Sequence, residues 1–566
     1  MPDHRAGTNP DAQVEELLTR FRSPDLSLAS VLCDGHPPEA IAFRVVEADL
    51  SVSTVRFGQL REDSERMAAA LLDSGIGPGD RVATLMGKST DYLVTLLGIW
   101  RVGAVHVPLF TAFAPPAIAL RLRASRATLV VCDANQRAKL APGGDMPADP
   151  PWSVIVSASE EEPTGGDRTI RQLLAAQAPG TTAAVLGGEA PMIHISTSGT
   201  TGEPKGVVIP AWALATFQAY MTFGLDLRDD DVCWNAADPG WAYGLYYAIL
   251  GPMSLGRPSL LLRAGFSAEL TWAMLDRFGV TNLAAAPTVY RALRASGIAP
   301  PPGVRLRCAS SAGEPLTPDI NAWAAGALGV TVRDHYGQTE TGMLVNSHQH
   351  PAVAAPIKDG SMGRPMPGWS LEILELDSDR KAEPGALGRI TVERAASPLA
   401  WFTGYHVDET APAASQEASR AATASKLAAD GRWYLTGDTG AIDADGDYFF
   451  TSRDDDVIIM AGYRIGPFEV ESVLSTHPQV VESAAIGVPD ELRGEVIEAH
   501  VVLRDPTAAS DSLTAELQQL VKSRLAAHAY PRNIVFADSL PKTPSGKVQR
   551  FLLRRRRRAE LARGGS

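Results

Sequence analysis

The stretch Met192–Pro210, MIHISTSGTTGEPKGVVIP, has two apolar ends and a centre rich in glycine and hydroxyl groups. The apolar ends predict one strand entering and one strand leaving a loop over 196–206. Backbone N–H groups freed by glycine, hydroxyl groups and a lysine are the groups that bind phosphate. We therefore interpret this loop as a phosphate-binding loop and not as a polar hairpin turn. Its candidate phosphate-binding residues are Thr197, Ser198, Gly199, Thr200, Thr201, Gly202 and Lys205.

This loop differs from the Walker phosphate-binding loop. Pro204 stands five positions after Gly199, where the Walker loop needs a second glycine. The nearby stretch Gly87–Lys88–Ser89 does not form a Walker loop either, because Val82 occupies the position of its first glycine. The sequence therefore predicts a phosphate site of another kind.

The composition of the chain is that of a globular protein. It has 566 residues, 45% of them hydrophobic and 21% charged, which predicts two or more domains. The net charge of −13 argues against nucleic acid as a partner, and we interpret the Arg554–Arg558 run as a solvated helix end or tail. Four widely separated cysteines, no signal-type start and no long apolar run predict a cytoplasmic protein without a membrane segment.

Helical patterns alternate with short apolar runs along much of the chain. This alternation predicts an α/β fold with buried strands. We expect an amphipathic helix over 10–24 and, after about residue 440, two short strands around a turn at 444–446, followed by a helix that begins near Pro467. The expected helices are Glu62–Leu72 and Thr90–Val102, and the expected strands are Asp80–Leu85, Thr128–Cys132, Ser259–Leu262, Asn282–Ala286 and Leu306–Ser310.

Two stretches carry few large apolar groups. Residues 141–167 are rich in Pro, Gly, Asp and Glu and are expected to be loose, and the Ala/Ser-rich residues 408–430 are expected to form a surface insertion. The character of the sequence changes near residue 440, and a boundary at about residue 452 follows from it. This boundary gives an N-terminal domain over 1–451 and a C-terminal α+β domain over 452–566.

The segment TSGTTGEPKGV, Thr197–Val207, resembles the signature loop of the adenylate-forming superfamily, which includes the acyl-CoA synthetases. Further motifs of that family follow in the same order, and the resemblance runs from about residue 55 to 553. It implies a large N-terminal α/β domain with several subdomains and a small mobile C-terminal domain. The further motifs are SAGEP (311–315), YGQTE (336–340), YLTGD (434–438), RDDD with GYR (453–464) and PKTPSGKVQR (541–550).

The resemblance also implies roles for residues around ATP. Tyr336 packs on adenine, Thr339 reaches the α-phosphate, and Glu340 helps to hold Mg²⁺, for which a carboxylate is a suitable ligand. Asp438 accepts from the ribose hydroxyls, and Arg453 contacts ribose or phosphate. Ser452 stands where the family usually has glycine, which is a small departure. The remaining implied nucleotide-binding residues are Gly313, Glu314, Pro315, Gly337 and Gln338.

In the same resemblance, the C-terminal domain supplies the decisive cation. Lys547 bridges the substrate carboxylate and the α-phosphate, so the implied catalytic residues are Lys547, Thr339 and Glu340. Asp455 is the hinge for a rotation that follows adenylate formation. The implied CoA-binding residues are Ala461, Gly462, Tyr463 and Arg464.

These motifs predict an acyl-CoA synthetase that uses ATP, Mg²⁺ and CoA. The acid first gives acyl-AMP and pyrophosphate, and CoA then takes the acyl group. The likeness of 487–503 to acyl-CoA synthetases favours CoA. Alternatives are an enzyme for an aryl acid, transfer to a carrier protein or an amine, and a non-catalytic nucleotide-binding module, although Lys547, Glu340 and Asp438 are all present.

The identity of the acid is expected to depend on the segment 236–253. Trp241, Tyr243 and Gly337 are the predicted acyl-pocket residues, and the segment looks like that of medium-chain synthetases. Acetate-specific relatives have tryptophan at the position of Gly337, so we expect an acid longer than acetate and a shift toward acetate in Gly337→Trp. The resemblance further suggests an acetyltransferase that acts on Lys547. Oligomeric state and pathway stay open.

Overall fold

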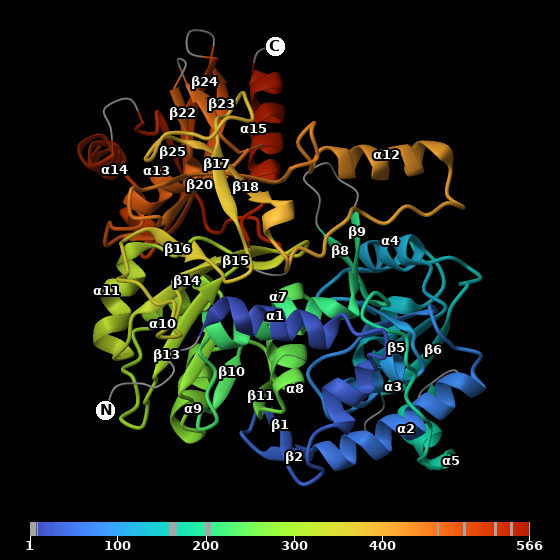
Figure 1. Cartoon of the computed structure of the whole chain (residues 1–566). Helices are drawn as coiled ribbons and strands as arrows, with labels where there is room; N and C mark the ends of the chain where they lie inside the picture. The colour runs from blue at the N-terminus through green and yellow to red at the C-terminus, as the bar shows by residue number, and fades with distance from the viewer. Residues whose placement is uncertain are drawn as a thin grey trace.

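The computed structural model describes residues 7, 9–157, 167–197, 205–454, 456–460, 463–490, 494–525, 529–543 and 547–564. Figure 1 shows a large N-terminal body below and a smaller group of C-terminal elements above it. Helices and strands are mixed throughout, which confirms the predicted α/β fold. In the described part of the chain, no helix has the length and apolar character needed to cross a membrane.

One sheet of seven strands holds the start of the phosphate-binding loop at its edge. Its order is β7-β6-β5-β3-β4-β8-β9, and the neighbours from β7 to β8 pair in parallel, whereas β9 pairs antiparallel with β8. The strands are β3 (Arg81–Leu85), β4 (Val105–Pro108), β5 (Leu129–Asp133), β6 (Ser153–Ser157), β7 (Arg168–Thr169), β8 (Pro191–Thr197) and β9 (Lys205–Pro210).

A second sheet of thirteen strands has a parallel half and an antiparallel half. Its order is β17-β18-β19-β20-β16-β15-β14-β13-β12-β10-β11-β1-β2, with parallel pairing from β14 to β1. The strands are β1 (Ile41–Glu47), β2 (Val52–Arg56), β10 (Cys233–Asn235), β11 (Ser259–Arg263), β12 (Asn282–Ala285), β13 (Cys308–Ala312), β14 (Val332–Gln338), β15 (Gly342–Asn346), β16 (Ser361–Pro365), β17 (Leu371–Leu374), β18 (Gly388–Glu393), β19 (Trp433–Ile442) and β20 (Tyr448–Arg453).

The helices of the N-terminal body pack on these two sheets. Helix α3 shows why they form: Ser89 caps its first turn by accepting from the Tyr92 N–H, and almost all of its residues are buried. The helices are α1 (Pro10–Phe21), α2 (Phe57–Asp73), α3 (Thr90–Arg101), α4 (Pro115–Ser125), α5 (Ile170–Ala176), α6 (Leu214–Ala219), α7 (Ala242–Gly244), α8 (Gly251–Leu255), α9 (Ala268–Arg277), α10 (Pro287–Ala295), α11 (Pro318–Ala327) and α12 (Ala413–Ala424).

The C-terminal elements have a hydrophobic core of their own, which runs from Ile458 to Leu553. Strand β25 joins the sheet β22-β21-β24-β23 by pairing with β24. These elements lie above the ends of β14 and β16 in Figure 1. They are β21 (Ile458–Met460), β22 (Tyr463–Ile465), β23 (Val480–Asp490), β24 (Gly494–Leu503), β25 (Asn533–Phe536), α13 (Pro467–Leu474), α14 (Asp511–Arg524) and α15 (Arg550–Gly564).

Most predicted elements are confirmed within one or two residues of their ends, and α2 is longer than predicted. The expectation that 141–167 is loose was wrong at one place, because Ser153–Ser157 forms β6 and pairs with β5. The Arg554–Arg558 run is also more than a solvated end. It lies in α15, where Arg554 donates to Asp456 Oδ1 (2.6 Å) and Arg557 donates to the buried Glu498 Oε2 (2.9 Å).

Candidate active site

A cavity of about 1120 Å³ lies where the carboxyl ends of the parallel strands meet the C-terminal elements. Ligands bind at this edge of open α/β sheets because the loops that follow the strands converge there. Among predicted site residues with described side chains, only Tyr243 does not line the cavity. Those that do are Thr197, Lys205, Trp241, Gly313, Glu314, Pro315, Tyr336, Gly337, Gln338, Thr339, Glu340, Asp438, Arg453 and Lys547.

The phosphate-binding loop begins and ends on paired strands. Thr197 closes β8 directly opposite Lys205, the first residue of β9. The Lys205 Nζ lies 5.3 Å from the centroid of the Tyr405 ring. The predicted residues Ser198, Gly199, Thr200, Thr201 and Gly202 lie outside the described residues.

Glu340 is a buried carboxylate at the side of the cavity nearest Lys205. Its Oε1 accepts from the Tyr405 hydroxyl (2.7 Å), and its Oε2 receives no hydrogen bond from the described residues. The described residues hold no group of three or more His, Cys, Asp or Glu suited to a metal. That fits Mg²⁺, which is bound by one or two carboxylates and completes its shell with substrate phosphates and water.

Asp438 is held at the opposite side of the cavity. Its Oδ2 accepts from the Tyr336 hydroxyl (2.5 Å) and from Gln338 Nε2 (2.7 Å), and no described residue donates to its Oδ1. Gln338 is itself held, because its Oε1 accepts from the Tyr434 hydroxyl (2.8 Å). Arg453 lies directly across from Asp438 in the pairing of β19 with β20. One carboxylate oxygen thus stays open toward the cavity, beside an arginine.

Lys547 enters the cavity from the C-terminal elements. Its N–H donates to Thr543 Oγ1 (3.0 Å) and its carbonyl accepts from the Thr543 N–H (2.7 Å), so two hydrogen bonds join these residues. Its Nζ lies 5.6 Å from the centroid of the Trp241 ring. Desolvation lowers the pKa of this ammonium, and the nearby Glu314 carboxylate opposes that shift. The open cavity still leaves the side chain accessible to water.

Trp241 forms the wall beneath this lysine. Gly313 has a φ of +103°, and a Cβ at this position would lie 2.7 Å from the Trp241 ring. Glycine at 313 therefore serves both the turn and the close approach of the indole. Behind Trp241, Tyr243 bonds to the Tyr220 hydroxyl (3.0 Å), which also contacts His335 Nδ1 (2.6 Å). Tyr243 lies in this buried layer and does not line the cavity, and its role in an acyl pocket stays a prediction.

Gly337 lines the cavity but does not mark an open pocket for a larger side chain. A Cβ at Gly337 would overlap the carbonyl oxygen of Gly342 and lie 2.7 Å from Met343 Cα. The pairing of β14 with β15 is irregular between Tyr336 and Gly337, which brings the two backbones together. A larger residue at 337 would therefore meet the backbone of β15 at its Cβ, and the shift toward acetate in Gly337→Trp stays a prediction.

Other predicted residues are only partly described. The predicted hinge Asp455 and the predicted CoA-binding residues Ala461 and Gly462 lie outside the described residues. Tyr463 and Arg464 are described as backbone in β22, where they pair with Met460 and Ile459.

Several cavity residues were not among the predicted site residues, and three of them make contacts that shape the site. Tyr405 holds Glu340, Asp334 lies near the Leu316 N–H, and Lys426 contacts the YLTGD turn. The position of Tyr405 in the motif FTGY was a signal that could have been used. Lys426 carried no such signal, because it stands in the Ala/Ser-rich segment.

Comparison with known proteins agrees with this geometry. The AMP-binding enzyme family matches residues 33–406, and the AMP-binding enzyme C-terminal domain family matches residues 469–547. The acetyl-coenzyme A synthetase of Bacillus subtilis (strain 168) is 34% identical over 507 residues, which cover 88% of this chain and 84% of that protein. The solved Brucella canis acyl-CoA synthetase is 40% identical, with a TM-score of 0.73 over 99% of both chains. A benzoate CoA ligase from Burkholderia xenovorans LB400 is 28% identical, with a TM-score of 0.80 over 94% of this chain and 100% of that chain.

A nucleotide cavity beside a phosphate-binding loop, with a lysine supplied by a smaller C-terminal domain, defines the class of adenylate-forming enzymes. Within that class, the chain belongs to the AMP-binding enzyme family and is an AMP-forming acid–CoA ligase.

Gly337→Ala tests the packing of β14 on β15. The added methyl would meet the β15 backbone, so we expect a lower melting temperature and lower activity with every acid tried, by a similar factor. Thermal unfolding and a series of acids of increasing length provide the measurement. A selective change of chain-length preference at unchanged stability would contradict this role.

Asp334→Asn tests a carboxyl that lines the cavity and accepts a hydrogen bond from the Leu316 N–H (3.3 Å). Burial raises the pKa of Asp334 to about 7, well above its value in an unfolded chain. Its stabilising contribution is therefore full below about pH 4 and is lost as the pH rises toward 7. We expect the melting temperature of Asp334→Asn, relative to the parent protein, to increase between pH 5 and pH 8. A constant difference across that range would contradict the raised pKa.

Proposed function

We propose that the cavity binds ATP and a short- or medium-chain carboxylic acid on the two sides of Lys547, with the residues named above in the roles that the family implies. The observation that carries this proposal is the position of the Lys547 ammonium. It lies over Trp241 and within electrostatic reach of Glu314, Asp438 and Glu340, so it stands between the apolar wall and the nucleotide carboxylates.

In the first half-reaction, an oxygen of the acid attacks the α-phosphorus of ATP. A new O–P bond forms, the bond from the α-phosphorus to the bridging oxygen breaks, and pyrophosphate leaves with the electron pair. The two reacting groups are both anionic, and Lys547 offsets their repulsion as they approach. Thr339 contacts the α-phosphate, and Lys205 binds the phosphates that depart.

No protein nucleophile takes part in this scheme. All four cysteines are buried, and burial raises the pKa of Cys33, Cys132 and Cys233 to about 12 and that of Cys308 to about 11. They are therefore protonated at neutral pH and unsuited to attack. Positioning and charge neutralisation supply the catalysis instead.

Glu340 would hold Mg²⁺ through its open Oε2, and the metal would neutralise charge on the β- and γ-phosphates. The Tyr405 hydroxyl fixes the orientation of this carboxylate. The protein thus contributes one oriented oxygen ligand, and ATP and water provide the others.

In the second half-reaction, the thiol of CoA attacks the carbonyl carbon of acyl-AMP, a C–S bond forms, and AMP leaves. We propose that 452–566 rotates as a unit against 1–451 about Asp455, which removes Lys547 and presents 461–464 to CoA. The separate hydrophobic core of the C-terminal elements supports motion as a unit.

The acid is proposed to be a short- or medium-chain acid, with an aryl acid as the second candidate. The indole of Trp241 offers a flat apolar surface, and the hydrogen-bonded layer of Tyr243, Tyr220 and His335 fills the space behind it. The relatives named for acetate and for benzoate are similarly far from this chain in sequence. The test measures acid-dependent pyrophosphate release and CoA consumption with acids of two to twelve carbons and with several aryl acids. The preferred acid decides between the two candidates, and a protein that releases pyrophosphate with none of these acids would contradict the proposal.

Lys547→Ala separates the two half-reactions. We expect acyl-adenylate formation to fall by at least about 100-fold, because the bridging cation is lost, while CoA thioester formation from supplied acyl-adenylate stays within about threefold. Stopped-flow pyrophosphate release and thioester assays measure the two steps. Equal loss of both would contradict a role confined to the first.

The lowered pKa of Lys547 gives this step a pH dependence. The ammonium must be charged, so adenylate formation is expected to decline on the alkaline side at a pH below the usual range of lysine, about 10.4. The thioester step, from which Lys547 is absent, should lack this decline. An identical alkaline limb in both steps would exclude Lys547 as its cause.

Two further proposals concern regulation and location. Acetylation of Lys547 would remove the bridging charge and switch off the first step, and an acetyltransferase would then be a partner. The four free, buried cysteines support a reducing compartment such as the cytoplasm. Mass spectrometry of the protein from cells in several growth conditions tests the modification, and fractionation tests the location.

A further inference from the structure

Lys426 stands at the edge of the cavity on the turn that carries Asp438. Its Nζ donates to the Thr436 carbonyl (2.6 Å) and lies 3.3 Å from the place where a Cβ of Gly437 would be. It also lies 5.7 Å from the centroid of the Tyr434 ring. The ammonium is therefore fixed on one side by a carbonyl and on another by an aromatic ring, and its side chain lines the cavity.

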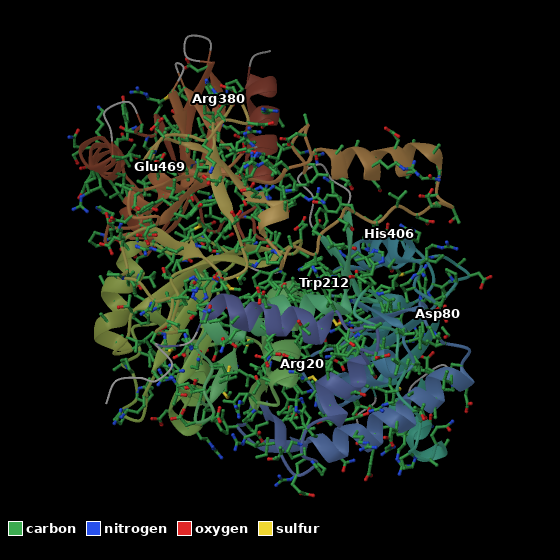
Figure 2. All side chains as sticks on the ribbon, viewed as in Figure 1. Arg20, Asp80, Trp212, Arg380, His406 and Glu469 are labelled. Atoms are coloured by element: carbon green, nitrogen blue, oxygen red, sulfur yellow. The ribbon has the colours of Figure 1, made fainter. Side chains whose placement is uncertain are left out.

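The segment that supplies Lys426 is anchored at both of its ends. At its start, the His406 N–H donates to the Gly206 carbonyl on β9 (2.8 Å), and Figure 2 shows His406 below α12 near this strand. At its end, the Leu435 N–H donates to the Lys426 carbonyl (2.8 Å). Helix α12 between these anchors has no buried residue and lies over the β8–β9 hairpin in Figure 1. The segment is thus an exposed helix whose end delivers a lysine to the cavity.

The charges of the cavity favour an anion near Lys426. In the part of the chain that the structure describes, Lys205, Lys426 and Lys547 form no ion pair, although all three line the cavity. The strongest electrostatic interaction of Lys426 is with Glu340, followed by Asp438, and Arg453 and Lys205 repel it. The Thr436 carbonyl uses one of the three donors of the ammonium, which leaves two. A partly buried lysine with unused donors and no carboxylate is suited to bind phosphate.

We propose that Lys426 binds the β- and γ-phosphates of ATP together with Lys205, so that two lysines hold the pyrophosphate that departs. The position beside Glu340, which is proposed to hold the metal on the same phosphates, selects these phosphates over adenine and the α-phosphate. The assignment rests on the proposed function. It also gives the Ala/Ser-rich segment 408–430 a role, which is to carry a phosphate ligand.

The test compares ligands that differ only in the phosphates that Lys426 would contact. Lys426→Met is measured for binding of ATP with Mg²⁺, pyrophosphate with Mg²⁺, and AMP, each without acid. Loss of a hydrogen bond to a charged group predicts a Kd for ATP and for pyrophosphate that rises roughly 10- to 100-fold. The Kd for AMP should change less than about twofold. Lys426→Arg, which keeps the charge, should retain most of the affinity for pyrophosphate.

Arg420→Met is the matched control, because it removes a cation from the same segment, 408–430. Arg420 is half-exposed, pairs with Glu409 and does not line the cavity. Its affinities for all three ligands should equal those of the parent protein. Thermal unfolding of each variant shows whether the fold is kept, and thioester formation from supplied acyl-adenylate should be normal in Lys426→Met.

Two results would overturn the proposal. An equal loss of affinity for AMP and ATP would show that Lys426 only holds the turn of Asp438, and an unchanged affinity for ATP and pyrophosphate would show that it contacts neither. Failure of the proposed function is seen separately, as a parent protein that releases no pyrophosphate with any acid.

Discussion

Repulsion between two anions is the physical constraint on which this active site depends. In the proposed reaction a carboxylate and a triphosphate must come within bonding distance, and the cation that offsets their repulsion is proposed to leave before the thiol of CoA arrives. The chain places that cation, Lys547, on the C-terminal elements and the nucleotide residues on the two large sheets. The C-terminal elements that carry Lys547 have a hydrophobic core of their own.

The same constraint accounts for the pattern of hydrogen bonds in the cavity. The two carboxylates that face ATP, those of Glu340 and Asp438, are each held at one oxygen by tyrosine or glutamine donors and left open at the other. The lysines of the cavity form no ion pair among the described residues, so their charge is not neutralised before ATP binds. Carboxylates oriented by neutral donors and cations without protein partners together give a site that is preorganised for a metal-bound polyanion.

The sequence was sufficient for the parts of the molecule in which local chemistry and chain order agree. A phosphate-binding loop needs glycine, hydroxyl groups and lysine in one short stretch, so its residues can be recognised together in the sequence. The YGQTE and YLTGD motifs lie on strands whose ends meet. The short strand β6 was missed because its few apolar residues stand among prolines and acidic residues, and only pairing with β5 makes it a strand. Lys426 was missed for a related reason. Its contact with the Thr436 carbonyl depends on how two segments of the chain pack together, and no local sequence pattern predicts that packing.

The surroundings of the predicted acyl-pocket residues depend on packing between distant segments, so the sequence alone could not predict them. Gly337 is required by the close approach of β15, and Gly313 by the close approach of the Trp241 ring. Each glycine is therefore explained by a backbone or ring contact, without reference to a substrate. The position of Trp241 is in turn limited by Tyr243, whose hydroxyl is held by Tyr220 against His335. The wall that Trp241 forms is therefore supported by a layer of hydrogen-bonded aromatic residues behind it. A change in that layer would move the wall without touching any residue that contacts ATP.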